Sequence, residues 1–120
     1  MDVLELEIKG QRYEFKFGLG FAKDINKTYQ RTENGLTEDA GLAANIAQVI
    51  SGDVISLATV LDYANKHKKP RVTPQLLEEY FDDPDTDIDE VFAQVNDFLS
   101  RSNAISKVYR TMKTALESMI

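Results

Sequence analysis

One segment, residues 13–29, changes its hydrophobic period, and this change limits what the chain can fold into. Its first five residues alternate aromatic and charged side chains, which is typical of a strand with one buried face. Glycines follow at positions 18 and 20, and the apolar residues then recur at steps of three and four, as on one side of a helix. The sequence therefore predicts a strand, a tight corner and a helix. The aromatic residues of this segment are expected to form the hub of the core: Tyr13, Phe15, Phe17, Phe21 and Tyr29.

A second alternating run precedes this segment, over residues 3–9. Leu4, Leu6 and Ile8 are predicted to point inward, with charged residues between them. A short turn containing Gly10 separates this run from the second strand, so the two runs predict a β-hairpin. A lone hairpin is marginally stable in water, and helices must cover its apolar face.

The next part of the chain predicts two helices separated by a turn. The first is expected over residues 19–31, and Asn34-Gly35 then supplies a turn or a helix stop. Thr37 is the predicted N-cap of the second helix, because acidic residues follow it. The buried stripe of that helix is predicted to be Leu42, Ile46, Val49 and Ile50.

Clear start and stop signals divide the remainder into further helices. Gly52 ends one helix and Asp53 caps the next, while Thr73-Pro74 starts a short fourth helix. An acidic linker over residues 82–87 leads into a fifth helix, which is expected to break at 100–103, with a continuous helix as the alternative. The predicted fold class is α+β, mainly α: an N-terminal β-hairpin (3–17) packed on a cluster of five or six helices, with helices 1 to 5 within 19–101 and a C-terminal amphipathic helix over 104–120, in a single domain spanning 1–120.

Composition excludes several classes of protein. The 120 residues contain no cysteine, which excludes a disulfide framework and thiolate metal sites. A net charge of −6 disfavours nonspecific nucleic-acid binding, although a local basic patch remains open. The N-terminus lacks the basic and apolar regions of a signal peptide, and no apolar run approaches the roughly 20 residues of a membrane span. We therefore expect a cytoplasmic protein that binds neither nucleic acid nor membrane.

Two patterns resemble catalytic or cofactor sites only in part. Gly18 and Gly20 follow a strand and precede a helix, but Lys23 replaces the third glycine of a dinucleotide fingerprint. The glycines are better explained by a tight corner. His67 is the one histidine, and a catalytic or metal-binding histidine needs partners that the sequence does not offer. We expect no enzyme, no cofactor and no metal.

The acidic linker carries a third partial pattern. Asp85, Asp87 and Asp89 alternate as in the first half of a calcium loop, but Glu90 stands where the loop needs glycine and Asn96 where it needs a bidentate glutamate. Solvated linker charges at a helix start are the preferred interpretation, with weak calcium binding as the alternative.

The C-terminal helix allows two interpretations. Its apolar stripe contains Met112 and Met119, and Lys107, Arg110 and Lys113 crowd its polar side. It is either a helix that packs into the core or an adaptable surface that docks a partner helix, because methionine accommodates varied shapes.

The order of these features resembles the tail assembly chaperones of long-tailed, siphovirus-type bacteriophages or prophages of Gram-positive bacteria. The resemblance rests on blocks that follow one another in the family's order and span nearly the whole chain: LEIKGQRYEFKFGLGFAKDINKTY, GDVISLATVLDYA, the Thr73-Pro74 helix start, and DIDEVFAQVNDFLSRSNAISK. These motifs are structural, so their order and not any single residue carries the likeness.

The resemblance implies a non-enzymatic helper in the host bacterial cytoplasm that is absent from the mature virion. Its implied partners are the tape measure protein, which it keeps soluble, and the major tail protein, which it helps recruit during tail tube assembly. Self-association is possible if many copies coat one tape measure protein. The predicted partner-binding residues lie on the last helix: Tyr109, Met112, Leu116, Met119, Lys107, Arg110 and Lys113. The alternative is a small phage or mobile-element adaptor that binds a host protein.

Overall fold

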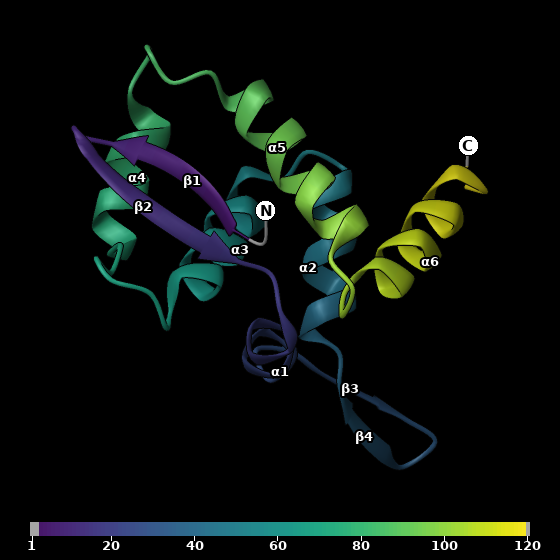
Figure 1. The fold of residues 1–120 in the computed structure, drawn as a ribbon. Coiled ribbons are helices and arrows are strands. Elements are labelled where there is room, and N and C mark those ends of the chain that lie inside the picture. The colour runs from purple at the N-terminus through teal and green to yellow at the C-terminus, as the bar shows by residue number, and fades with distance from the viewer. Residues whose placement is uncertain (1–2, 120) are drawn as a thin grey trace.

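A computed structural model describes residues 3–119, and it contains two β-hairpins and six helices (Figure 1). The elements in chain order are β1 (Val3–Ile8), β2 (Gln11–Lys16), α1 (Leu19–Asn26), β3 (Gln30–Glu33), β4 (Leu36–Asp39), α2 (Gly41–Ile50), α3 (Val54–Asn65), α4 (Pro74–Asp82), α5 (Ile88–Arg101) and α6 (Ser106–Glu117). The predicted class, a hairpin followed by five or six helices, is confirmed.

The N-terminal hairpin forms as its alternating sequence predicts. β1 and β2 pair antiparallel with Leu4 opposite Phe15 and Leu6 opposite Tyr13, and all four side chains are buried. The intervening turn uses positive φ at Lys9 and Gly10, which suits the twist of a two-residue hairpin loop. α3 packs against β2 and α5 against β1, so helices cover the apolar face that a lone hairpin would leave in water.

Aromatic residues form the predicted hub at the corner between β2 and α1, with one exception. The rings of Phe17 and Phe21 meet edge to face, 5.3 Å apart, and Phe98 of α5 lies 6.2 Å from Phe17. Tyr29 does not join them. Its side chain is 53% exposed, because the helix on which it was placed ends before it.

The prediction of one helix over residues 19–31 is wrong in its second half. α1 ends at Asn26, and a second hairpin, β3–β4, occupies the segment that follows. Asn34 and Gly35 both have positive φ, the conformation of a type I′ loop, so they close a hairpin instead of ending a helix. Thr37 consequently lies within β4 and caps no helix, and α2 begins at Gly41.

The base of this second hairpin is held tightly against α1. A Cβ added to Gly41 would lie 2.1 Å from the carbonyl oxygen of Ile25, so only glycine fits there. The side chain of Asn26 accepts a hydrogen bond from the Leu42 N–H at 3.2 Å. These contacts bring the start of α2 against the end of α1 and leave the hairpin projecting from the body (Figure 1).

The predicted helix starts after Asp53, after Thr73 and at the end of the acidic linker are confirmed, whereas the last helix is shorter than the predicted 104–120 and ends at Glu117. The Asp53 side chain accepts from two N–H groups at the start of α3, and the Thr73 and Asp87 side chains cap α4 and α5 in the same way. α5 ends at Arg101, within the predicted break, and α6 begins at Ser106.

One buried polar side chain connects three parts of the fold. Asn65, at the end of α3, is fully buried, and its amide nitrogen donates to the carbonyl oxygens of Glu14 at 3.0 Å and Pro70 at 3.1 Å. Its oxygen accepts from the Val72 N–H at 2.6 Å and from Arg71 Nη1 at 3.0 Å. Asn65 therefore fixes β2 and the loop before α4 relative to α3.

Candidate partner-binding surfaces

The predicted partner helix, α6, packs against α2 and α5 and lies on the opposite side of the molecule from α4 (Figure 1). Its apolar residues divide into three levels of exposure. Tyr109 is buried, Met112 and Leu116 are half-buried, and Met119, in the turn that follows the helix, is 80% exposed. One edge of the helix therefore packs into the core, as the first interpretation predicts, and another edge faces solvent, where docking of a partner stays a prediction.

Tyr109 is the predicted binding residue that the structure removes from the surface. Its hydroxyl donates to the side-chain oxygen of Asn96 on α5 at 2.8 Å, and its ring is only 6% exposed. Burial raises the pKa of this hydroxyl above its usual value. Tyr109 therefore holds α6 on α5, and a partner would not contact its ring in this conformation.

The cations of α6 lie beside its apolar edge. Lys107, Arg110 and Lys113 are exposed, and within residues 3–119 none is within ion-pair distance of a carboxylate. Lys113 and Leu116 line a hollow of about 360 Å³ between α6 and the end of α2. We define the α6 face as the exposed and half-buried members of the predicted set: Lys107, Arg110, Met112, Lys113, Leu116 and Met119.

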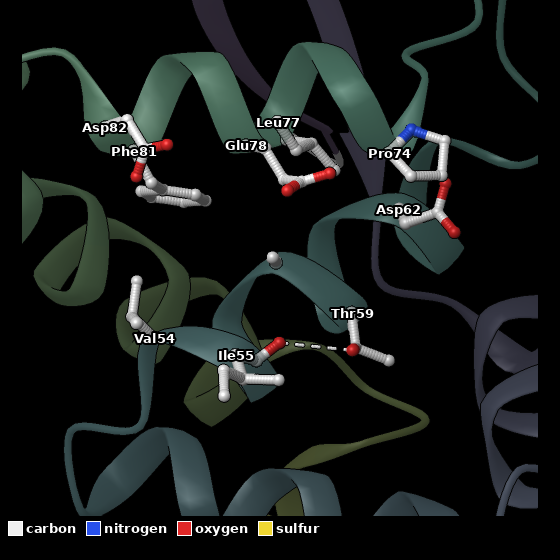
Figure 2. A pocket seen from close by; sticks show the side chains of 10 residues that line it. Val54, Ile55, Thr59, Asp62, Pro74, Leu77, Glu78, Phe81 and Asp82 are labelled. Atoms are coloured by element: carbon white, nitrogen blue, oxygen red, sulfur yellow. Dashed lines mark hydrogen bonds between the residues drawn. The ribbon is translucent and has the colours of Figure 1, made fainter.

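A groove between α3 and α4 is a second candidate, and the sequence did not predict it. It has a volume of about 370 Å³, within the range of roughly 300–1,000 Å³ typical of binding pockets. Figure 2 shows its two walls, with side chains of α3 facing side chains of α4. We define the α3–α4 groove by its lining: Val54, Ile55, Ala58, Thr59, Asp62, Pro74, Leu77, Glu78, Phe81 and Asp82.

The lining of this groove combines exposed apolar side chains with acidic ones. Ile55 is 76% exposed and Val54 39% exposed, so the mouth offers apolar surface to a partner. Glu78 and Asp82 supply exposed carboxylates. Asp62 Oδ1 lies 2.9 Å from Arg71 Nη2, but no N–H is aligned on it, so the contact is an ion pair without a hydrogen bond.

A sequence signal for this groove existed but was weak. Ile55 follows the Asp53 cap but falls outside the buried stripe of α3, so its exposure follows from helical spacing. The separation of α3 and α4 depends on how the intervening loop folds. Asn65 fixes this loop through hydrogen bonds within 66–72 and ties it to β2 through Glu14, and no periodic pattern signals these bonds.

The remaining candidate chemistry is sparse in the part of the chain that the structure describes. There, no three His, Cys, Asp or Glu side chains converge as metal ligands, and no helix is long and apolar enough to cross a membrane. His67 Nε2 lies 3.1 Å from the Asp24 carboxylate, and this hydrogen bond, opposed by burial and assisted by Lys66, lowers the pKa of Asp24. His67 itself is exposed, at a helix end.

Comparison with known proteins identifies one family. The family model described as phage tail assembly chaperone protein, TAC, matches residues 5–113. No curated protein and no solved structure shows significant similarity to the chain. The match covers the N-terminal hairpin from its third residue, the β3–β4 hairpin, the α3–α4 groove, and the α6 face except Leu116 and Met119.

Proposed function

This chain belongs to the phage tail assembly chaperone family, and we propose from this that it binds the tape measure protein of a long-tailed phage or prophage of Gram-positive bacteria. In this role it keeps the tape measure protein soluble and helps recruit the major tail protein during tail tube assembly. It works in the host cytoplasm, does not enter the mature virion and catalyses no reaction.

The observation that carries this proposal is the α6 face. A long helical partner with an apolar stripe needs a surface that buries the stripe, and Met112, Leu116 and Met119 offer adaptable apolar area at helical spacing. Lys107, Arg110 and Lys113 have no ionic partners within residues 3–119 and can meet acidic residues that flank such a stripe.

The α3–α4 groove is a second surface that the same partner could use. Its exposed Ile55 would gain up to about 1.5–3 kcal/mol from complete burial by a partner. The acidic side chains of Glu78 and Asp82 favour a basic flank, the opposite of what the α6 face favours. The two surfaces therefore predict tape measure segments of opposite charge.

The test is co-expression with fragments of the tape measure protein encoded beside this gene, followed by a solubility assay and pull-down. Three substitutions introduce the same aspartate at exposed apolar positions: Met119→Asp on the α6 face, Ile55→Asp at the groove, and Leu19→Asp, 67% exposed at the start of α1, as the matched control. Each position is largely in water already, so all three variants should fold.

We expect fragments that aggregate alone to become soluble when they are co-expressed with the native chain. Met119→Asp should abolish this gain in solubility and the pull-down, and Leu19→Asp should leave both unchanged. Charge reversal at Lys107, Arg110 and Lys113 should weaken binding of acidic fragments in the same assay. Loss with Ile55→Asp alone would move the site to the groove. If no fragment binds and solubility is unchanged, the tape measure role is refuted, and an adaptor that binds a host protein becomes the leading function.

A further inference from the structure

The β3–β4 hairpin is unusual because neither of its faces is covered. Every residue of both strands is exposed, including Leu36, which is 76% exposed. The hairpin projects away from the helices in Figure 1. An isolated two-stranded hairpin is marginally stable, and its two open edges are templates for pairing with another strand.

The backbone geometry determines which groups each open edge presents. The Ala40 N–H donates to the Tyr29 carbonyl at 2.8 Å, and these two residues continue the register in which Gln30 pairs with Asp39. Because hydrogen-bonded and non-hydrogen-bonded pairs alternate along an antiparallel ladder, the N–H and C=O groups of Gln30 and Thr32 point outward from β3. By the same alternation, the N–H and C=O groups of Thr37 and Asp39 point outward from β4.

This alternation allows three two-fold registers for pairing β3 with β3 of a second copy, centred on Gln30, Arg31 or Thr32. The register centred on Gln30 places Arg31 opposite Tyr29 of the second copy and forms no ion pair, which leaves two registers to compare. One places Arg31 opposite Arg31, with two like charges in contact. The other places Thr32 opposite Thr32 and Arg31 opposite Glu33 of the second copy, and two-fold symmetry forms that ion pair twice. Only the second register is electrostatically favourable.

We infer that the β3 edge is a self-association site, at which two copies join their hairpins into one four-stranded sheet centred on Thr32. Arg31 already pairs with Glu38 of its own hairpin. In the four-stranded sheet it also faces Glu33 of the second copy, so it lies between these two carboxylates. Glu33 forms no ion pair within residues 3–119 of a single copy, and this sheet supplies one.

The β4 edge does not offer the same match. Its permitted registers place Glu38 opposite Leu36 or opposite Glu38 of the second copy, so they either lack an ion pair or bring carboxylates together. The closed two-fold pairing of β3 also avoids the open-ended stacking that β3-to-β4 pairing would produce. The interface is small, so we expect a weak, concentration-dependent dimer.

The absence of cysteine from the chain makes this register directly measurable. In the proposed sheet the two Thr32 Cα atoms form a hydrogen-bonded pair about 5.5 Å apart, a separation that a disulfide spans. Thr32→Cys should therefore form a disulfide-linked dimer under mild oxidation. Thr37→Cys is the matched control, because Thr37 is the direct cross-strand neighbour of Thr32 and differs only in facing the other edge.

We expect Thr32→Cys to cross-link at least about tenfold faster than Thr37→Cys, and faster than Arg31→Cys, which reports the competing register. Equal rates for the two threonine positions, or faster cross-linking at Thr37 or Arg31, would overturn the proposal. Sedimentation of the cysteine-free chain over a range of concentrations should show reversible dimers. A continuous series of larger species would indicate β3-to-β4 stacking and would also contradict it.

A charge swap separates the proposed contact from the stability of the hairpin itself. In the Thr32→Cys background, Arg31→Glu should slow cross-linking about tenfold. The substitution places a carboxylate opposite Glu33 of the other copy at both symmetry-related contacts, and the like charges repel. Adding Glu33→Arg should restore the rate, although the bond from Arg31 to Glu38 stays lost. If the double variant remains slow, the intermolecular ion pair does not exist and the register is wrong.

Discussion

Replacing Asn65 with alanine should destabilise the protein more than its small change in volume suggests. The side chain is fully buried and makes all four of its hydrogen bonds, to β2 and to the loop that leads into α4. Alanine removes every one of them. Three of the four groups left behind are backbone groups, which cannot change rotamer to find new partners, and the fourth is the side chain of Arg71.

The cost follows from the surroundings of each abandoned group. Val72 is 1% exposed, so its N–H loses its partner without access to water, at roughly 1–3 kcal/mol. The carbonyl oxygens of Glu14 and Pro70 each lose one donor, at roughly 0.5–1.5 kcal/mol each. The sum is about 2–6 kcal/mol, which at about 4 °C per kcal/mol for a chain of this length lowers Tm by about 8–24 °C.

The measurement is urea unfolding followed by circular dichroism at 222 nm, since the chain has no tryptophan to report by fluorescence. The matched control is Asn103→Ala, the same substitution at an exposed residue between α5 and α6, where we expect a change within about 0.5 kcal/mol. A loss below 1 kcal/mol for Asn65→Ala, at an unchanged m-value, would refute the argument that these four bonds fix the loop.

Three further substitutions test other parts of the fold. Gly41→Ala should cost at least about 2 kcal/mol in urea unfolding, because its Cβ would collide with the Ile25 carbonyl oxygen; a neutral result would show that the base of the second hairpin can shift. Thr73→Ala removes the α4 cap and should cost about 1 kcal/mol by the same measurement, and restoration by Thr73→Ser would identify the hydroxyl as the cause. His67→Ala should raise the pKa of Asp24 toward its ordinary value in an NMR titration. The native contact stabilises the fold when the pH is above the ordinary pKa of Asp24, and this stabilisation is lost as the pH falls through the lowered pKa. An unchanged Asp24 pKa in the variant would contradict the assignment.

Sequence periodicity predicted most of the fold because most elements bury one regular face. The alternation of Leu4, Leu6 and Ile8 defined the first strand, and the caps Asp53 and Thr73 defined helix starts, since each signal is local. The β3–β4 hairpin was missed because it buries nothing, so its strands show no apolar alternation. Asn34-Gly35 was the available signal, and it is stronger for a type I′ hairpin than for a helix stop.

The candidate surfaces were harder to predict because exposure depends on tertiary packing. Helical spacing placed Tyr109, Met112 and Leu116 on one stripe, but it could not show that α5 offers Asn96 as the partner of Tyr109. The α3–α4 groove depends on the loop held by Asn65, and no periodic pattern signals the hydrogen bonds that hold it, of which one reaches Glu14 in β2 and the others reach Pro70, Arg71 and Val72. Local patterns therefore identify the helix that carries a surface, while long-range contacts decide which residues remain accessible.

The residues that hold this fold together differ from those proposed to bind partners, and this separation suits an assembly chaperone. The side chains that hold the hairpin and helices together are almost completely buried, as Phe15 and Leu61 illustrate. The large apolar residues most exposed to water lie at the periphery, on the α6 face, at the α3–α4 groove and on the β3–β4 hairpin: Met119, Ile55 and Leu36. A protein that bound its partner through core residues would have to unfold partly to do so, whereas this one can gain and release a partner with its core intact. Substitutions at the three peripheral sites should therefore change association while leaving the free energy of unfolding within about 0.5 kcal/mol, and a peripheral variant that lost both together would show that its surface is part of the core.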